Sequence, residues 1–419
     1  MAKEMNLTQW LSWMEQCHTA EIDLGLDRVS RVADELQLDL SSSTVVTVAG
    51  TNGKGSTVSY LSSIYLQAGY SVGAYTSPHF LRYNERVRLN GLEATDEQLC
   101  DAFERIDQAR GQIPLTYFEF GTLAALIIFA DTKPDLVLLE VGLGGRLDAV
   151  NIIDADVSVV TTVSIDHVDW LGDDREFIGH EKSGIFRADK PAICGDLNPP
   201  VSVAKYAADI GAELYQADQQ FSFEKTKKGW HWKGLNADGS EQIINDLPLP
   251  SLPLQNASTA IQVCQHIPLN VSADQIKTGL QTATLTGRMQ KLEVDGVNYW
   301  LDVAHNPEAA ELLAKRIKDM PKPVTLLLGM LADKDCQQVI DLITPVVDSI
   351  YLTDLNVPRG QKASALAALL PSGVHALQAD TVKSAIEQIK KHTNAEENVI
   401  IAGSFFTVSD ALSELGKEK

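Results

Sequence analysis

The sequence predicts an α/β protein, built on a P-loop-containing, doubly wound and mainly parallel sheet and followed by a second, smaller α/β domain of the Rossmann-like kind. Apolar runs at 135–141 and 156–163 do not alternate with polar residues, as expected for parallel strands covered on both faces. Stretches of helical periodicity separate such runs. The length of 419 residues is comfortable for two domains.

The first half of the chain alternates helical and strand signals. Leu7, Trp10, Leu11 and Met14 recur at helical spacing behind a possible cap at Asn6. A capping box at 95–98 opens another helix. The remaining elements expected here are helices at 26–38, 57–68 and 118–130, and strands at 44–48 and 71–75.

The stretch at 221–245 is short, polar and rich in turn residues, and predicts an antiparallel excursion. An extended, proline-rich connector at 247–253 leads to helices at 256–266 and 273–282, the second behind another capping box. A break at 285–288 is the best domain boundary, which gives domains of residues 1–287 and 288–419. Strand-like and helical segments alternate again beyond it, at 299–303, 307–318, 324–329, 336–343, 349–352, 382–389 and 398–402.

A glycine-rich turn at 49–56 stands between the strand at 44–48 and a helical pattern. Glycines let backbone N–H groups face a phosphate, the helix N-terminus adds positive potential, and Lys54 can reach the β and γ oxygens. The usual P-loop has glycine where Val48 stands and Ser or Thr where Gly55 stands, so its hydroxyl is displaced to Ser56. The turn predicts use of ATP or GTP; the alternative is a flexible turn with a chance lysine.

Composition narrows the class of protein. The net charge of −21 and the pI of about 4.8 argue against a nucleic-acid or membrane-surface role, so local positive charge must receive any anionic substrate. The apolar stretch at 123–130 is too short to span a bilayer, and no signal peptide is evident at the N-terminus. Five scattered cysteines indicate neither zinc nor disulfides. We expect a cytoplasmic protein.

Four polar clusters are expected at strand ends or in loops, where open α/β sheets bind ligands: 76–79, 140–148, 166–172 and 180–186. A hydroxyl, a carboxylate and an imidazole from three strand ends could surround a hard divalent ion beside the phosphates, although imidazole is an unusual Mg²⁺ ligand. The alternatives are a plain turn at Ser77, helix caps at Asp166 and Asp169, a salt bridge at Glu140 and a surface position for Lys182. In the second domain, 302–307, 329–335 and 403–405 offer polar strand ends, or turns with helix N-caps at Asn306 and Asp333.

Taken together, these motifs resemble the dihydrofolate synthase/folylpolyglutamate synthase family of Mur-ligase-like ATP-dependent amide ligases. Gly-Thr-Asn-Gly-Lys-Gly at 50–55 is that family's form of the phosphate loop, while Ser56 and Val303 stand where relatives often carry Thr and Gly. Nine segments carry the resemblance in the family's order, at 22–26, 50–55, 76–79, 116–119, 140–148, 166–167, 181–186, 287–288 and 301–307.

The resemblance implies roles for individual residues. Ser77, Glu140 and His167 would bind Mg²⁺, and carbamylated Lys182 would bind a second Mg²⁺. ATP would be held by Thr51, Asn52, Gly53, Lys54, Gly55, Ser56 and Asn256, and by Arg288 and Asp302 reaching across from the smaller domain. The pterin substrate would be held by Glu21, Ile22, Asp23, Leu24, Thr116, Tyr117, Phe118, Glu119, Leu147, Asp148 and Ala149. Lys54, Lys182, Arg288 and His305 would be catalytic.

The implied reaction joins L-glutamate to dihydropteroate, and further glutamates to reduced folates, through an acyl phosphate made from ATP. No organic prosthetic group is expected, and the family indicates a monomer. The base that deprotonates the amine stays open between His305 and His79. The sequence also leaves open the preference between dihydropteroate and folates, the polyglutamate length and whether Lys182 is carbamylated.

Two rival functions remain. A Mur-type peptidoglycan ligase carries a UDP-sugar-binding domain before the phosphate loop, and a loop at residue 50 leaves no room for one. A nucleotide-dependent switch or binding protein would lack ligase activity. Release of phosphate that requires both a pteroate or folate and glutamate would separate a ligase from such a switch.

Overall fold

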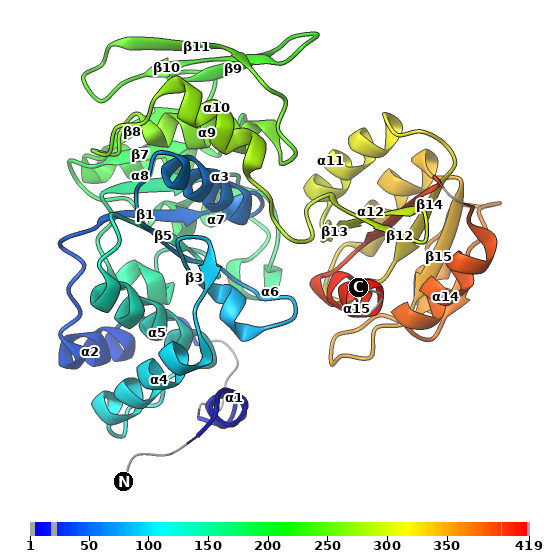
Figure 1. The fold of residues 1–419 in the computed structure, drawn as a ribbon, viewed down its shortest axis with the longest axis horizontal. Coiled ribbons are helices and arrows are strands. Elements are labelled where there is room, and N and C mark those ends of the chain that lie inside the picture. Colours follow the sequence, from blue (N-terminus) through cyan, green and yellow to red (C-terminus); the bar gives the residue numbers. More distant parts are fainter. Residues whose placement is uncertain (1–4, 18–22, 395, 417–419) are drawn as a thin grey trace. The chain divides into compact units, whose positions relative to one another are not determined.

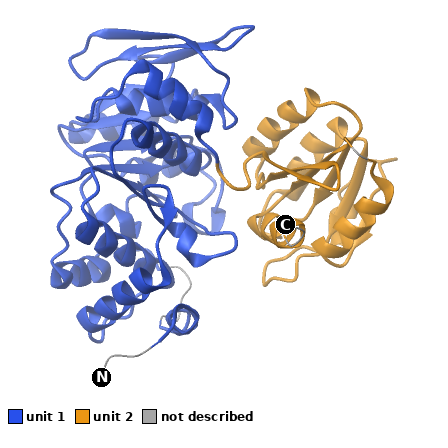
Figure 2. Ribbon diagram, in the orientation of Figure 1, with its two compact units in different colours: residues 1–284 blue, residues 285–419 orange. Residues whose placement is uncertain are grey.

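The computed structural model describes residues 5–17, 23–394 and 396–416. The chain divides into two compact units, residues 1–284 and 285–419 (Figure 2). Each unit is built on a sheet of its own, so each is described by itself.

The first unit contains the mainly parallel, doubly wound sheet that the sequence predicts. Six strands run parallel, and β3 pairs antiparallel with β2 and β4 at one edge. In spatial order the strands are β4 (Leu92–Glu93), β3 (Val87–Leu89), β2 (Val72–Tyr75), β5 (Leu136–Glu140), β1 (Thr44–Ala49), β6 (Val157–Val160), β7 (Pro191–Cys194) and β8 (Glu213–Gln216).

Helices cover both faces of this sheet (Figure 1). One face packs against α1 (Leu7–Met14), α2 (Asp27–Leu36), α4 (Asp96–Arg110), α5 (Tyr117–Thr132), α7 (Arg175–Ser183) and α8 (Val201–Ile210). The other face carries α3 (Lys54–Gln67), α9 (Leu254–Cys264) and α10 (Ala273–Thr282). The capping boxes predicted at Thr95 and Ser272, and the cap at Asn6, are confirmed because each side chain accepts the backbone N–H of its N3 residue.

The antiparallel excursion is also confirmed, as a three-stranded sheet of β9 (Ser222–Lys225), β10 (Trp230–Leu235) and β11 (Glu241–Leu247). Trp230 and Trp232 of β10 are buried, and the indole Nε1 of Trp232 donates to the carbonyl of Ser258 on α9 at 3.2 Å. Burial of two large aromatic side chains fixes this sheet on α9.

The second unit repeats the α/β pattern around a six-stranded sheet with one antiparallel edge strand. Its strands, in spatial order, are β12 (Gln290–Val294), β13 (Val297–Asp302), β17 (Asn398–Ala402), β14 (Val324–Leu328), β15 (Ser349–Thr353) and β16 (Leu377–Ala379). Its helices are α11 (Pro307–Lys318), α12 (Cys336–Ile343), α13 (Ala363–Ala367), α14 (Val382–His392) and α15 (Phe405–Leu415), with a 3₁₀ turn η3 (Thr344–Val346). Asn306 caps α11 as predicted, whereas α12 is capped by Asp335 and not by Asp333.

One local expectation was wrong. The cluster at 180–186 is not confined to a strand end or loop, because its first residues form the last turn of α7. That turn is stabilised from its buried side, where Ile178 and Ser183 face the core and the Ser183 hydroxyl donates to Gly179. Lys182 is therefore carried by a helix, and its backbone is held more rigidly than a loop would hold it.

Candidate functional site

The phosphate loop joins the end of β1 to the start of α3, and its shape depends on two glycines. Gly50 and Gly53 have φ of 148° and 91°, in the region that glycine adopts at least cost. A side chain on Gly50 would collide with Thr161 Oγ1, and one on Gly53 would come within 2.6 Å of the Asn256 amide. The loop is thus pressed between the end of β6 and helix α9.

Hydrogen bonds from the end of β6 hold the loop open. Asn52 N donates to Thr162 Oγ1 at 3.1 Å, and Thr161 Oγ1 donates to Asn52 O at 2.6 Å. Thr51 Oγ1 donates to Ser164 O at 3.0 Å. Thr161, Thr162 and Ser164 were not predicted to belong to the site, although a run of hydroxyl residues directly after a buried apolar strand was a usable signal.

Lys54 lies folded back over this loop. Its Nζ donates to Gly50 O at 2.9 Å and to Thr51 O at 3.3 Å. These carbonyls hold the ammonium group next to the turn whose N–H groups and helix N-terminus can receive phosphate oxygens. The structure therefore gives the loop the charge and shape that its sequence predicts.

Three strand ends bring the predicted metal ligands to one edge of the sheet. Ser77 follows β2, Glu140 ends β5 and His167 follows β6. The Ser77 N–H donates to Glu140 Oε2 at 3.3 Å, and the Glu140 side chain is buried. His167 is exposed with a left-handed φ of 52°, and its N–H donates to Asp166 Oδ1 at 2.8 Å.

Two of these three donors fit a hard divalent ion, whereas the imidazole of His167 is an unusual ligand for Mg²⁺. A buried carboxylate and a hydroxyl are oxygen ligands of the kind Mg²⁺ prefers, and the ion usually completes its shell with water and phosphate oxygens. Within the described ranges, no three or more His, Cys, Asp or Glu side chains gather as a metal site would.

The glycine-rich segment after β5 is organised by one buried carboxylate. Asp148 Oδ2 accepts from Gly142 N at 3.0 Å and Leu143 N at 2.9 Å, and Oδ1 accepts from Val150 N at 3.1 Å. Burial raises the pKa of Asp148 to about 6, against the backbone N–H groups and Lys54, which favour the ionised form. Asp148 also caps the 3₁₀ turn η2 (Ala149–Ile152).

The same segment is tied to the turn of α7 that carries Lys182. Arg146 Nε and Nη2 donate to Glu181 Oε1 at 2.9 and 2.8 Å, and Arg146 N donates to Glu181 O at 2.8 Å. A side chain on Gly145 would come within 2.8 Å of the Lys182 carbonyl. Lys182 itself is only 4% exposed, which is unusual for lysine because burying an ammonium group is costly.

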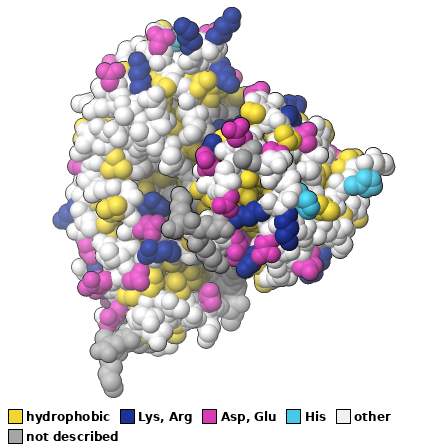
Figure 3. Space-filling view, turned by 45° about the vertical axis from the view of Figure 1, so that its right-hand side comes forward, with side chains coloured by type: hydrophobic (Ala, Val, Ile, Leu, Met, Phe, Trp, Pro, Cys, Tyr) yellow, Lys and Arg dark blue, Asp and Glu magenta, His cyan; other side chains and the backbone are white. Residues whose placement is uncertain are grey.

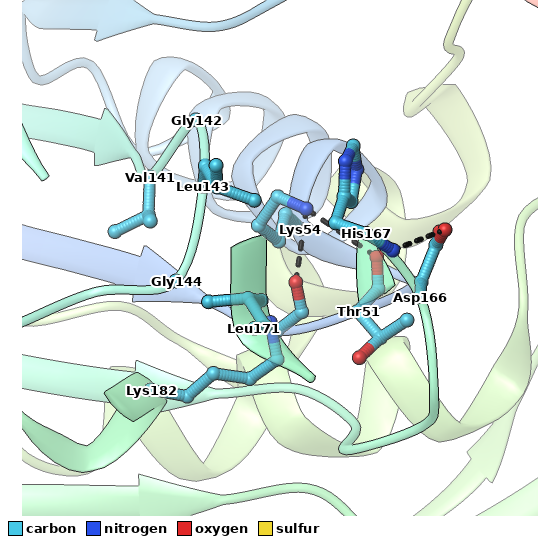
Figure 4. Close-up of a pocket in the computed structure, with 11 residues that line it drawn as sticks. Thr51, Lys54, Val141, Gly142, Leu143, Gly144, Asp166, His167, Leu171 and Lys182 are labelled. Carbon is cyan, nitrogen blue, oxygen red and sulfur yellow. Dashed lines mark hydrogen bonds between the residues drawn. The ribbon is translucent and has the colours of Figure 1, made fainter. Parts of the chain in front are cut away.

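A pocket lies where these segments meet (Figure 4). It brings together Thr51 and Lys54 of the phosphate loop, His167, and Lys182, as the sequence predicts. Its full lining is Gly50, Thr51, Lys54, Val141, Gly142, Leu143, Gly144, Asp166, His167, Leu171 and Lys182. Leu171, in the short helix α6 (Val168–Leu171), belongs to the predicted cluster at 166–172 but was not predicted to be a site residue.

The segment at 116–119, which is predicted to hold the pterin, adjoins the glycine-rich segment. Phe118, in the first turn of α5, packs so closely on Gly142 that a side chain there would come within 2.6 Å of its ring. Thr116 and Glu119 form the capping box of α5, and both are buried. Tyr117 stacks edge-on against Tyr83 at 5.6 Å, on the 3₁₀ turn η1 (Tyr83–Arg86).

The other predicted pterin residues differ in exposure. Ala149 and Asp148 are buried, Leu24 and Leu147 are half-buried, and Asp23 is exposed. Glu21 and Ile22 lie outside the described residues.

The remaining predicted residues belong to the second unit. Asp302 ends β13, and its carboxylate accepts from Met289 N and Ala304 N at 2.9 Å each. Burial raises the pKa of Asp302, and Arg288 opposes that rise. Arg288 lies over the Phe405 ring at 5.5 Å. His305 Nδ1 lies 2.8 Å from Val303 O.

Charges of both signs are mixed on the surface. On the face drawn in Figure 3, Lys and Arg side chains of the described residues lie among Asp and Glu side chains. Among the described helices, none has the length and apolar character needed to cross a bilayer.

Two family models match the chain: the Mur ligase middle domain over residues 48–245, and the Mur ligase, glutamate ligase domain over residues 287–405. Over 408 residues the chain is 45% identical to the dihydrofolate synthase/folylpolyglutamate synthase of Escherichia coli, which covers 97% of this chain and 94% of that protein. The protein of the same name from Haemophilus influenzae is 38% identical, covering 96% of each.

The chain is also similar to solved structures of folylpolyglutamate synthase/dihydrofolate synthases. Escherichia coli FolC in complex with DHPP and ADP has a TM-score of 0.93 and 44% identity, covering 99% of this chain and 98% of that one. A bifunctional folylpolyglutamate synthase/dihydrofolate synthase with Mn, AMPPNP and L-glutamate bound has a TM-score of 0.91 and 44% identity, with the same two coverages, 99% and 98%.

Proposed function

Because the chain belongs to the dihydrofolate synthase/folylpolyglutamate synthase family of Mur ligases, it is an ATP-dependent ligase that forms carbon–nitrogen bonds, and we propose that the residues around its phosphate loop perform this reaction. The substrates are L-glutamate and either dihydropteroate or a reduced folate. Relatives crystallised with DHPP and ADP, or with AMPPNP and L-glutamate, support this set. Neither a Mur-type peptidoglycan ligase nor a switch protein is favoured.

Amide formation needs ATP because a carboxylate has no adequate leaving group. Transfer of the γ-phosphoryl group gives an acyl phosphate, and the amine of glutamate then displaces phosphate. Protein groups contribute in-line positioning and positive charge on the oxygens that move. We assign this work to Lys54 and to the N–H groups of residues 51–56 at the start of α3, with Asn256 packed against the loop at Gly53.

Ser77, Glu140 and His167 would hold one Mg²⁺ beside the phosphates, and Lys182, as a carbamate, would hold a second. When bound there, the ions would neutralise charge on the phosphoryl oxygens. The Ser77–Glu140 hydrogen bond and the burial of Glu140 support the first assignment. The burial of Lys182 in the pocket supports the second, since carbamylation replaces a buried ammonium with a group that can ligate.

The pterin would lie against Asp23, Leu24, residues 116–119 and residues 147–149, and the proposal extends to Glu21 and Ile22. The close packing of Phe118 on Gly142 supports a shared site, because it brings the start of α5 to the pocket segment. Asp148 would orient the ring through its carboxylate while it holds the loop.

His305 is a better candidate than His79 for the base that deprotonates the amine. The Nδ1 of His79 accepts from Arg86 Nε at 2.9 Å, and burial with the charge of Arg86 lowers the pKa of His79 to about 4. The acceptor nitrogen of His79 therefore already accepts a hydrogen bond. The Nδ1 of His305 faces a carbonyl, which can only accept, so Nδ1 carries the proton and Nε2 is the basic nitrogen.

The proposal also assigns Arg288 and Asp302 to ATP, with Arg288 acting on the transferred phosphoryl group. It places the phosphate loop and the pterin site in residues 1–287, and it places glutamate ligation in residues 288–419, the domain that supplies Arg288 and Asp302 to ATP. We further propose a cytoplasmic monomer without an organic prosthetic group.

One observation carries the proposal: a phosphate loop with its lysine opens onto the same pocket as His167 and Lys182. The test supplies purified protein with ATP, Mg²⁺ and glutamate, and offers dihydropteroate and tetrahydrofolate in separate reactions. We expect phosphate release only when both acceptor and glutamate are present, and a product heavier by one glutamate. Phosphate release when the acceptor or glutamate is missing, or the absence of a product lengthened by glutamate, would contradict the proposed function.

A further inference from the structure

Arg28, in the first turn of α2, joins two segments that are far apart in the sequence. Its Nε donates to Glu119 Oε2 at 3.1 Å, and its Nη1 donates to Asp23 Oδ2 at 2.6 Å. Its Nη2 also donates to the backbone carbonyl of Asp23. One guanidinium group therefore holds both the main chain and the side chain ahead of α2 against the start of α5.

The partner on α5 is a buried carboxylate with a second task. The Glu119 side chain is only 4% exposed, and its Oε2 also accepts from Thr116 N at 2.8 Å and from Thr116 Oγ1 at 3.0 Å. Glu119 thus closes the capping box of α5 while it receives Arg28. A buried carboxylate that lost its cation would be costly, so Arg28 and Glu119 keep one another in place.

We infer that Arg28 is a positioning residue for the folate substrate: by bridging Asp23 and Glu119, it fixes the segment at Asp23 and Leu24 against the first turn of α5. The inference rests on the proposed pterin site, to which both of these segments belong. Arg28 acts through Asp23 and the capping box and need not touch the substrate.

The planar guanidinium is essential to this role. Its Nε and Nη groups point to different acceptors at fixed angles, whereas a lysine ammonium is one point of charge on a flexible stem. Arg28→Lys can satisfy Glu119 or Asp23, but not both together with the Asp23 carbonyl. Arg28→Ala satisfies none of them.

The test measures steady-state kinetics of Arg28→Ala and Arg28→Lys in the full chain. For Arg28→Ala we expect KM for dihydropteroate and tetrahydrofolate to rise about tenfold or more, while KM for ATP and kcat at saturation change less than about twofold. Arg28→Lys should fall between Arg28→Ala and the wild type. A residue with only a structural role would lower thermal stability or the active fraction and leave KM for folate unchanged.

A double-mutant cycle tests the route of the effect. Asp23→Asn should also raise KM for folate, and the Arg28→Ala/Asp23→Asn pair should raise it less than the product of the two single effects, since both break one link. Arg31→Ala is the matched control, because Arg31 is an exposed arginine on the same helix. Its KM for folate should equal that of the wild type.

Phe118→Ala separates failure of this inference from failure of the proposed function. If Phe118→Ala raises KM for folate and both Arg28 variants do not, Arg28 has no positioning role and the proposed site stands. If none of these variants affects KM for folate, the pterin site itself is misplaced. Should Arg28→Ala not fold, Arg28→Lys decides, and a wild-type KM for folate in that variant would overturn the inference.

Discussion

Arg146 donates two hydrogen bonds to a single oxygen of Glu181, from Nε at 2.9 Å and from Nη2 at 2.8 Å. The Glu181 side chain is 7% exposed and that of Arg146 is 43% exposed, so a surface arginine neutralises a buried carboxylate. Glu181 directly precedes Lys182. The pair therefore fixes the last turn of α7 against the glycine-rich segment of the pocket.

Arg146→Ala should lose both stability and turnover. It leaves the Glu181 carboxylate buried without its cation, at a cost of about 1–3 kcal/mol of unfolding free energy. Displacement of Lys182 should lower kcat about tenfold or more. Urea unfolding and steady-state kinetics measure the two effects. Adding Glu181→Gln should recover part of the stability, and Lys205→Ala, which removes the exposed pair with Asp209, should change neither quantity.

Lys182→Ala should cut turnover severely and leave the fold intact. The truncation removes the group that is proposed to become a carbamate, and we expect kcat to fall on the order of 100-fold or more. Circular dichroism would check the fold, and mass spectrometry of the intact wild-type chain under CO₂ would look for the added mass of the carbamate. Wild-type-like activity in this variant would remove the case for a second metal.

Local patterns explain why so much of the first unit could be predicted from the sequence. The caps at Asn6, Thr95 and Ser272 depend on residues three positions apart, and the phosphate loop depends on one short segment between a strand and a helix. The hairpin of β3 and β4 was missed although Asn90 and Gly91, with φ of 53° and 80°, form its turn. Its strands are too short to show any periodicity.

Contacts between distant segments could not be predicted in the same way. Thr161 lies 109 positions from Asn52, and Arg28 lies 91 positions from Glu119. Such pairs depend on which strands become neighbours in the sheet, and strand order is not written in any local pattern. The sequence therefore pointed to the loop after β1 and to the strand ends, parts of which line one pocket, but not to the residues that hold these segments together.

The free energy of unfolding should decrease as the pH rises from mildly acid to neutral, and this decrease should depend on Asp148. Burial raises the pKa of Asp148 from its ordinary value of 3.8 to about 6 in the folded protein. The folded state therefore binds this proton more tightly than the unfolded state does. This contribution is fully present below the unfolded pKa and is lost as pH rises through the folded value. Asp148→Asn cannot ionise and should lack this loss.

Urea unfolding at pH 4.5 and at pH 7.5 measures the effect. The destabilisation caused by Asp148→Asn should be smaller at the higher pH by about 2 kcal/mol, since one pKa unit corresponds to about 1.4 kcal/mol. Asp34→Asn, at an exposed carboxylate on α2, should show no such change between the two pH values. A destabilisation by Asp148→Asn that grows as pH rises would show that the carboxylate, not the acid, is the stable folded form.

The last prediction concerns the amine. His305→Gln should lower kcat about 100-fold or more, because a general base typically contributes that much. His79→Gln should have a smaller effect, since the imidazole of His79 already accepts from Arg86. His375→Gln, at an exposed histidine of the second unit, should leave kcat unchanged. These variants are compared by steady-state kinetics across the pH range in which histidine titrates.

A substitute nucleophile separates loss of the base from loss of phosphoryl transfer. Hydroxylamine is already unprotonated at neutral pH, so it should attack the acyl phosphate without a base and yield a hydroxamate. In His305→Gln, hydroxamate formation should stay near the wild-type rate while glutamate ligation falls. If both fall together, His305 acts on the phosphate and not on the amine, and the base must be sought in another group.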